Sequence, residues 1–277
     1  MKKAFLIADS GGSKTDWVLH DSLGNTNSFT TDSYHPHLMS DEWVASKKGF
    51  WEEYIKIYDF EVHFYGSGCL QEKNKEIVKK SFQEWGIHKV NVQSDLIGAA
   101  NACFGDKNGF IGILGTGSVI AEIENCSVKK LHGGFGYLLG DEGSGYYFGK
   151  LILQKYLHNQ FSSKTLTEIE NVLGTREFIL ATIYSVKSKK FIGDLSFLLS
   201  ALNNEEITAL HDENIKQFIQ LYLPNEVKNK VISFVGSYAK INEETLRKHI
   251  NAANWELGII VEKPIELITE YLLKNTF

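Results

Sequence analysis

The sequence predicts an α/β protein with two similar halves, and three observations support this fold class. The chain has 277 residues, which is too long for one ordinary core and suits two domains of middle size. Short apolar runs alternate with amphipathic segments, an order typical of mixed sheets covered by helices. A strand, a glycine-rich turn and a second strand occur near residue 10 and again near residue 115. A repeat of this size indicates two similar halves that face each other.

The first half is predicted to begin with three strands in hairpins and to continue with alternating helices and strands. The expected strands are Lys3–Ala8, Thr15–Asp21, Thr26–Thr31, Glu61–Tyr65 and Lys89–Gln93. The expected helices are Asp41–Ile57, Gln71–Trp85 and Asp95–Cys103. A break near 103–108 contains Gly, Asp and Asn, so we expect an N-terminal domain of residues 1–105.

The second half, residues 106–277, is predicted to repeat this plan with a helical insertion. The expected strands are Phe110–Leu114, Val119–Glu124, Ser127–Leu131, Val231–Val235 and Leu257–Val261. The insertion, Ser144–Leu223, is expected to be largely helical, with turns at Gly174 and Gly193. Further helices are expected at Tyr238–Ile250 and Ile265–Lys274, the last opened by Pro264. The last helix is a candidate to pack back on the first half.

Composition and charge exclude several classes of function. Hydrophobic residues make up 43% and charged residues 23%, as in soluble globular proteins, and the net charge of −5 comes without a basic stripe. Nucleic acid and anionic membranes are therefore poor candidate partners. The three cysteines form no CxxC pair, which argues against disulfides, zinc and iron–sulfur clusters. The N-terminal apolar run is too short for a signal peptide and no stretch could span a bilayer, so we expect a cytoplasmic protein.

The first glycine-rich turn follows an apolar strand that ends in an acidic residue. Glycines let backbone N–H groups approach phosphate oxygens, the neighbouring hydroxyl and ammonium groups could add donors, and the aspartate could hold Mg²⁺. A Walker A sequence is absent. The alternative is an ordinary hairpin turn. The residues concerned are Asp9, Gly11, Gly12, Ser13, Lys14 and Thr15.

The second glycine-rich turn, Gly115-Thr116-Gly117, also follows an apolar run. Either turn alone fits a routine hairpin. Two such turns at the same place in a repeat favour a pair of phosphate clamps, because a nucleotide held between two facing hairpins needs this duplication.

Asp95 follows a predicted strand and opens a predicted helix. Its carboxylate could be an N-cap, which accepts backbone N–H bonds. At the carboxyl end of a strand it could instead accept the proton of an attacking hydroxyl, and both roles can hold through different oxygens.

Two later segments also combine glycines with polar residues. Residues 132–146 place many glycines in one loop, which suits close contact between backbone and a ligand, with Asp141 and Glu142 as acceptors for ligand hydroxyls. Residues 236–240 join a strand to a helix, where small residues would let an adenosine lie on the helix N-terminus. The alternatives are a flexible surface loop and a routine strand-to-helix turn.

Together these segments resemble the actin-like ATPase and sugar kinase superfamily. More narrowly, they are similar to the BadF/BadG/BcrA/BcrD ATPase family and, within it, to the N-acetylglucosamine kinases. The motifs that carry the resemblance are DSGGSKT at 9–15, ILGTGS at 113–118, HGGFGYLLGDEGSGY at 132–146 and FVGSYAK at 234–240. The resemblance implies two ribonuclease-H-like domains with a cleft between them, and ATP-dependent, Mg²⁺-dependent phosphorylation of an amino sugar such as N-acetylglucosamine. The 6-hydroxyl is the expected acceptor, because it is primary and the least hindered.

The resemblance also implies roles for individual residues. Asp9 matches the family's Mg²⁺ aspartate, Ser13 and Thr116 match contacts near the phosphates, and Asp95 matches the base. The positions that would line the sugar are Ser118, Val119, Gly134, Phe135, Gly136 and Asp141, together with Asp95. The positions that would line the adenosine are Gly236, Ser237, Tyr238, Ala239 and Lys240.

Two departures from the family pattern concern the identity of the sugar. His35 stands where the family often has an Asn that holds the sugar, and Phe135 replaces a tryptophan. Glucosamine or another hexose is therefore an alternative substrate, and a sugar-binding sensor without turnover is an alternative of another class. The cysteines that iron–sulfur activators of this family require are missing. Whether the chain forms a homodimer is left open.

Overall fold

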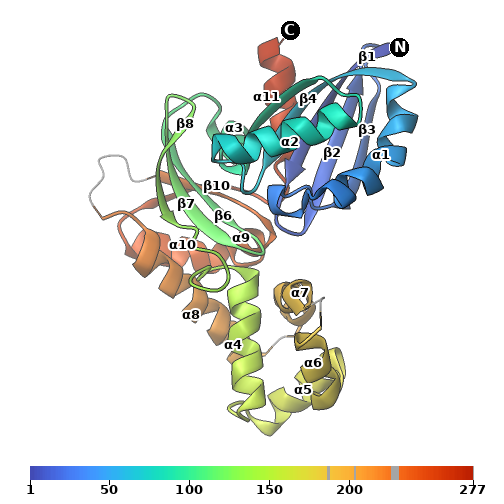
Figure 1. Ribbon diagram of the computed structural model, residues 1–277. Helices are drawn as coiled ribbons and strands as arrows, with labels where there is room; N and C mark the ends of the chain where they lie inside the picture. Colours follow the sequence, from blue (N-terminus) through green and yellow to red (C-terminus); the bar gives the residue numbers. More distant parts are fainter. Residues whose placement is uncertain (186–187, 203, 226–230, 277) are drawn as a thin grey trace. The chain divides into compact units, whose positions relative to one another are not determined.

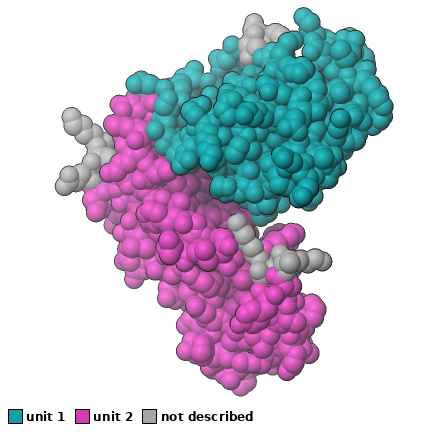
Figure 2. All heavy atoms as spheres, in the orientation of Figure 1, with its two compact units in different colours: residues 1–108, 125–128, 263–277 teal, residues 109–124, 129–262 magenta. Residues whose placement is uncertain are grey.

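A computed structural model describes residues 1–185, 188–202, 204–225 and 231–276 (Figure 1). The chain forms two compact units (Figure 2), of which unit 1 contains residues 1–108, 125–128 and 263–277 and unit 2 contains residues 109–124 and 129–262. In the described part of the chain, every helix is too short or too polar to cross a bilayer.

Unit 1 is built on a five-stranded sheet in the order β3-β2-β1-β4-β5. Its strands are β1 Lys2–Ser10, β2 Lys14–Asp21, β3 Thr26–Asp32, β4 Tyr58–Gly66 and β5 Lys89–Ser94. β1, β4 and β5 are parallel, and β2 pairs antiparallel with both β1 and β3. Because β1, β4 and β5 are parallel, their carboxyl ends lie at one edge of the sheet.

The helices of unit 1 cover both faces of this sheet. They are α1 Asp41–Ile55, α2 Glu72–Glu84, α3 Asp95–Phe104 and α11 Ile265–Thr276, with a short 3₁₀ helix η1 at Pro36–Leu38. α1 and α2 pack over an aromatic core that includes Trp17, Trp51 and Phe82, all fully buried. α11 packs against α3 and the first two strands. Alternate residues of the buried strands thus meet two different helical layers.

Unit 2 repeats the plan with its sheet in the order β10-β9-β6-β7-β8. Its strands are β6 Gly109–Leu114, β7 Ser118–Glu124, β8 Ser127–Gly133, β9 Val231–Val235 and β10 Glu256–Val261, and the first two residues of β8 are grouped with unit 1. Its helices are α4 Gly145–Leu157, α5 Ser163–Leu173, α6 Arg176–Ile183, α7 Ser188–Ser200, α8 Glu205–Tyr222, α9 Ser237–Ile241 and α10 Glu243–Ala252. The predicted fold class is confirmed, because the same strand order occurs twice with the helical insertion in the second copy.

Two local predictions in unit 2 are wrong. Gly193 is not a turn but lies inside α7, where a Cβ would approach Thr116 Cγ2 to 3.2 Å. The neighbouring helix α4 crosses α7 closely, since a Cβ at Gly149 would lie only 2.0 Å from the Ile192 carbonyl oxygen. The helix expected over Tyr238–Ile250 is broken at Asn242, which separates α9 from α10.

Candidate active site

The two acidic candidates of unit 1 lie at the carboxyl edge of its parallel strands. Asp9 is the penultimate residue of β1 and pairs with Tyr65 of β4, while Asp95 directly follows β5. Because β4 alone separates β1 from β5, this topology brings residues far apart in the sequence to one edge.

Asp95 is the first residue of α3 and not its N-cap, so that alternative is wrong. The N-cap is Ser94, whose Oγ accepts the Leu96 N–H at 3.3 Å. Asp95 Oδ1 accepts the same N–H at 2.9 Å and the Ser94 hydroxyl at 3.0 Å. These bonds fix the carboxylate through one oxygen, and a carboxylate with two oxygens keeps further acceptor capacity for a ligand.

Burial shapes the protonation of both carboxylates. It raises the pKa of Asp95 to about 6 against the opposing effect of the hydrogen bonds from Ser94 and Leu96. The pKa of Asp9 rises to about 7, first through burial and then through the negative charges of Asp95 and Asp16, while Lys14 opposes the rise. A carboxylate with a pKa near 6 is ionised at neutral pH and basic enough to accept a proton.

The first hairpin turn presents backbone rather than bulky side chains. Gly11 N–H donates to the Lys14 carbonyl at 3.0 Å, and Gly12, Ser13 and Lys14 are exposed. A Cβ at Gly12 would meet no atom within 4 Å, so the space in front of the turn is open. Lys14 Nζ lies 2.6 Å from Asp16 Oδ2, which keeps its ammonium group beside the turn.

Thr15 is buried, unlike the exposed residues 12–14 of the turn. Its hydroxyl lies 2.8 Å from the Ser10 hydroxyl. Both oxygens accept the Tyr34 N–H, at 3.0 Å for Thr15 and 3.2 Å for Ser10. The Thr15 hydroxyl therefore ties the turn to the segment before η1, and the exposed residues 12–14 are the part of the turn that a ligand can reach.

His35 lies in the same neighbourhood as this turn. It follows Tyr34 and caps η1, with Nδ1 accepting the His37 N–H at 3.2 Å. Its ring covers Gly68 in the loop after β4, because a Cβ there would lie 2.6 Å from His35 Nε2. Gly68 has a φ of +79°, which a residue with a Cβ rarely adopts. Unit 1 thus brings His35, the first turn and both aspartates to one edge of its sheet.

The second turn is bonded to the glycine-rich segment 132–146. Gly115 O accepts the Gly145 N–H at 2.8 Å, and Ser118 Oγ donates to the Glu142 carbonyl at 2.6 Å. Ser118 N–H points at Asp141 Oδ1, 3.4 Å away. Asp141 is 8% exposed and has a φ of +64°. The predicted phosphate turn and sugar segment therefore form one hydrogen-bonded assembly within unit 2.

The rest of the glycine-rich segment follows the same surface of unit 2. A Cβ at Gly134 would lie 3.0 Å from Val119 Cγ2, so these two predicted sugar positions are neighbours. Phe135 is 66% exposed, and its ring centroid is 6.2 Å from that of Tyr222 on α8. Tyr222 also donates its hydroxyl proton to the Glu142 carboxylate. Tyr222 is a supporting residue that the sequence analysis did not find.

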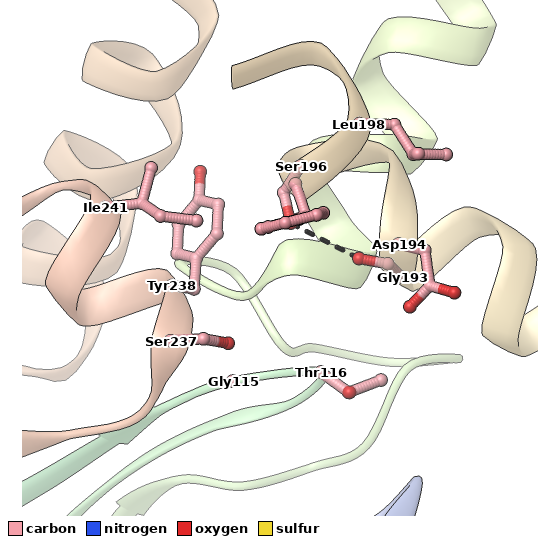
Figure 3. Close-up of a pocket in the computed structure, with 10 residues that line it drawn as sticks. Gly115, Thr116, Gly193, Asp194, Ser196, Leu198, Ser237, Tyr238 and Ile241 are labelled. Carbon is pink, nitrogen blue, oxygen red and sulfur yellow. Dashed lines mark hydrogen bonds between the residues drawn. The ribbon is translucent and has the colours of Figure 1, made fainter. Parts of the chain in front are cut away.

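A pocket of about 350 Å³ lies beside the second turn (Figure 3). It is lined by the turn, by α7 and by α9, with the residues Gly115, Thr116, Gly193, Asp194, Ser196, Phe197, Leu198, Ser237, Tyr238 and Ile241. The turn before α9 passes very close to β6, since a Cβ at Gly236 would lie 2.3 Å from the Leu114 carbonyl oxygen. The pocket thus unites the second phosphate turn with Ser237 and Tyr238 of the predicted adenosine segment.

Other predicted adenosine positions have structural partners nearby. Ala239 is fully buried, and the exposed Lys240 pairs with Glu243 at 2.8 Å. The α7 side of the pocket was not predicted as a binding element. Its only sequence signal is Gly193, which the sequence analysis interpreted as a turn.

Comparison with known proteins supports the fold and a likeness to sugar kinases. A solved Porphyromonas gingivalis protein, provisionally assigned as an N-acetylglucosamine kinase, superposes with a TM-score of 0.84 at 24% identity, covering 99% of this chain and 100% of that one. The protein has the actin-like ATPase fold. A ROK family glucokinase from Streptomyces griseus, solved with glucose and AMPPNP, has a TM-score of 0.55 at 16% identity and covers 99% of this chain and 100% of that one.

In sequence, the chain is 29% identical over 233 residues to an N-acetyl-D-glucosamine kinase of Dictyostelium discoideum, covering 74% of this chain and 73% of that protein. The chain is therefore similar to N-acetylglucosamine kinases. No family model matches the chain, so the narrower BadF/BadG/BcrA/BcrD family stays a prediction.

Proposed function

We propose that the protein transfers the γ-phosphate of ATP to an amino sugar, with the 6-hydroxyl of N-acetylglucosamine as the acceptor. The observation that carries this proposal is the position of Asp95. It lies at the carboxyl edge of the sheet, is fixed through Oδ1 by Ser94 and Leu96, and has a pKa raised by burial to about 6. The similarity to an N-acetyl-D-glucosamine kinase supplies the substrate class.

Phosphoryl transfer depends on positioning and charge neutralisation more than on covalent help from the protein. Asp95 accepts the proton of the sugar hydroxyl as that oxygen bonds to the γ-phosphorus, and the bond from this phosphorus to the bridging oxygen breaks, with ADP as the leaving group. With a pKa of about 6, the carboxyl group then releases the proton to water at neutral pH. Because burial makes this carboxylate more basic than an ordinary aspartate, it takes the proton more readily while still being ionised at neutral pH.

Asp9 fits a magnesium ion. Its carboxylate is buried beside the charge of Asp95, an arrangement that a nearby divalent cation would relieve. Proteins commonly hold Mg²⁺ through one or two carboxylates and the phosphates of the substrate, so Asp9 is the residue that would hold it here. The ion would neutralise charge on the transferred phosphoryl group.

The pocket beside the second turn is the proposed nucleotide site. Its volume of about 350 Å³ lies within the usual range for small-molecule pockets. The adenosine would contact Ser237 and Tyr238, and the backbone of the second turn, at Gly115 and Thr116, would receive the phosphates. The glucokinase solved with glucose and AMPPNP supports the proposal that this fold accommodates a sugar and a nucleotide.

The glycine-rich segment is the proposed sugar site of unit 2. Asp141 offers a buried carboxylate to sugar hydroxyls, and Ser118 lies next to it. Val119 follows Ser118 and contacts Gly134, the first residue of the 134–136 backbone. In unit 1, His35 would contribute through its ring. The replacement of the family Asn by His35 and of a tryptophan by Phe135 keeps glucosamine and other hexoses as alternative substrates.

A panel of sugars with ATP and Mg²⁺ tests this proposal through sugar-dependent release of ADP. We expect N-acetylglucosamine to give the highest kcat/KM. A matched control is Asp59→Asn, because Asp59 lies at the opposite end of β4 and pairs with Lys89 on the surface. Binding of both ligands without ADP release from any sugar would favour the sensor and contradict the kinase.

A further inference from the structure

One buried amide joins the two proposed ligand sites of unit 2. Asn214 lies on α8 and is fully buried. Its Oδ1 accepts the Gly143 N–H at 2.7 Å, and its Nδ2 donates to the Ser144 carbonyl at 3.0 Å and to the Tyr238 hydroxyl at 2.9 Å. Gly143 and Ser144 belong to the glycine-rich segment, whereas Tyr238 lines the nucleotide pocket.

Tyr238, the partner of Asn214 on the pocket side, also has a hydrogen-bond partner in His211. The Tyr238 hydroxyl lies 3.0 Å from Nδ1 of His211, one turn before Asn214 on α8. The His211 ring stacks on Phe148 with a centroid distance of 3.8 Å and an angle of 10°. Burial favours the neutral imidazole, so Nδ1 can accept the Tyr238 proton while the Tyr238 oxygen accepts from Asn214. The hydrogen bonds among Asn214, Tyr238 and His211 can therefore all form at once, with one orientation of each side chain.

The partner on the loop side has little freedom to move. A Cβ at Gly143 would lie 2.5 Å from Phe218 Cβ, so the loop backbone rests directly on α8 one turn after Asn214. Gly143 also has a φ of +82°. Without the Asn214 side chain, the buried Gly143 N–H would lose its partner and the Ser144 carbonyl would keep only the Phe148 N–H, so the loop would shift to recover the lost bond.

We propose that Asn214 is a positioning residue that couples the nucleotide-pocket wall at Tyr238 to the glycine-rich sugar loop. Removing the Tyr238 hydroxyl should disturb the loop at Gly143 although the two groups do not touch, because Asn214 bonds both. The inference rests on the proposed function only for the names of the two ligands.

The first test needs no ligand. Tyr238→Phe keeps the ring in the pocket and deletes only the hydroxyl. We expect amide hydrogen exchange at Gly143 to become about fivefold faster, the usual size of one lost hydrogen bond. The matched control is Tyr156→Phe, since Tyr156 is equally buried in unit 2 but donates its hydroxyl to Glu170. Equal exchange at Gly143 in the parent, the control and Tyr238→Phe would overturn the inference.

The second test measures sugar KM in a double-mutant cycle. We expect Tyr238→Phe to raise sugar KM about fivefold, and to have no further effect in an Asn214→Leu background, because the same link is already broken. Tyr156→Phe is again the control, as Tyr156 is buried in unit 2 but donates its hydroxyl to Glu170. Additive effects of Tyr238→Phe and Asn214→Leu on sugar KM would overturn the coupling.

The two tests separate this inference from the proposed function. A parent without sugar-dependent ADP release contradicts the kinase, and the exchange rate at Gly143 then still decides the coupling. Faster exchange in Tyr238→Phe supports the coupling even where no sugar is phosphorylated. If Asn214→Leu does not fold, the comparison of Tyr238→Phe with Tyr156→Phe decides by itself.

Discussion

The ionised carboxylate of Asp95 lowers the free energy of unfolding at neutral pH, because it is buried. Its pKa is raised from 3.8 to about 6 in the folded protein, so the unfolded chain ionises more readily. The cost is absent below pH 3.8 and complete above about pH 6, and it amounts to at most about 3 kcal/mol, since each pH unit is worth about 1.4 kcal/mol. A buried carboxylate that costs stability is characteristic of a functional site.

Asp95→Asn should therefore separate activity from stability. We expect kcat to fall at least about a hundredfold, the usual contribution of a positioned base. The free energy of unfolding in metal-free buffer at pH 7 should rise, by up to about 3 kcal/mol. Steady-state kinetics and urea unfolding measure the two effects. A variant that keeps more than half of the parent kcat would show that Asp95 is not the base.

His211 should make unit 2 sensitive to acid. Burial lowers its pKa from 6.5 to about 4. Between pH 4 and pH 6.5, His211 is therefore mostly protonated in the unfolded state and mostly neutral in the folded state. Stability from this residue is present above pH 6.5 and is lost as pH falls toward 4, by about 3 kcal/mol. We expect the parent to lose this much relative to His211→Gln between pH 7 and 4 in urea unfolding. A difference that stays constant with pH would contradict a neutral buried His211.

His35→Asn should leave the protein folded and change its use of the sugar. An asparagine side-chain oxygen can replace Nδ1 as acceptor of the His37 N–H, which preserves the cap of η1. We expect a changed KM for the sugar and a KM for ATP within about twofold of the parent, because one polar contact to the sugar differs. The exposed neighbour His37 supplies the control, His37→Asn. If both variants show the parent's sugar KM, His35 only shapes the turn.

The proposed role of the second hairpin turn in phosphate binding can be tested by a glycine-to-alanine substitution, which adds one methyl group. At Gly117 a Cβ would approach Asp141 Oδ2 to 3.2 Å, so a substitution there would also disturb Asp141. At Gly115 a Cβ would meet no atom within 4 Å, and its φ is not positive. Gly115→Ala therefore fills only the space proposed for phosphate.

We expect Gly115→Ala to keep the parent's melting temperature and to raise the Kd for ATP about tenfold, equivalent to about 1.4 kcal/mol. Gly49→Ala on α1 is the control, because a Cβ there also meets no atom within 4 Å. Titration calorimetry measures the Kd for ATP of each variant, and thermal unfolding measures its melting temperature. An unchanged ATP affinity in folded Gly115→Ala would mean that this turn is not a phosphate clamp.

Elements defined by local pattern could be predicted from the sequence, and those defined by distant contacts could not. The strands and both hairpins follow from short apolar runs bounded by glycines. Gly193 was misjudged because its small size serves a helix crossing with α4 and a contact with Thr116. The break at Asn242 was missed for a different reason, since it depends on a local bond from the Asn242 side chain to the Tyr238 carbonyl four residues earlier, which leaves no periodic signal in the sequence.

The candidate site divides in the same way. The positions of Asp9 near the end of one strand and of Asp95 after another could be predicted from the sequence, but their meeting at one edge follows from the parallel pairing of both strands with β4. Asn214 and Tyr222 could not be predicted as site residues, because they contact the glycine-rich segment from about 70 to 80 residues away, through hydrogen bonds to Gly143, Ser144 and Glu142. Such buried polar pairings leave no periodic signal in the sequence.

At the scale of the whole molecule, the two units share a strand order but not the acidic residue at the end of the first strand. Both units have the same strand order, yet the position of Asp9 near the end of β1 corresponds to Ile113 near the end of β6. Unit 1 contains the buried pair Asp9 and Asp95, whereas unit 2 contains the pocket and the glycine-rich segment with Asp141. One such pair of acids would serve the single phosphoryl transfer proposed for this protein.

The most direct measurement is the detection of the phosphorylated sugar itself. The protein is incubated with ATP, Mg²⁺ and N-acetylglucosamine, and the product is identified by NMR and mass spectrometry. The account predicts N-acetylglucosamine 6-phosphate from the parent and from Asp59→Asn, and at least about a hundredfold less from Asp95→Asn. No sugar phosphate from the folded parent with any hexose or amino sugar, or equal amounts from Asp95→Asn, would contradict it.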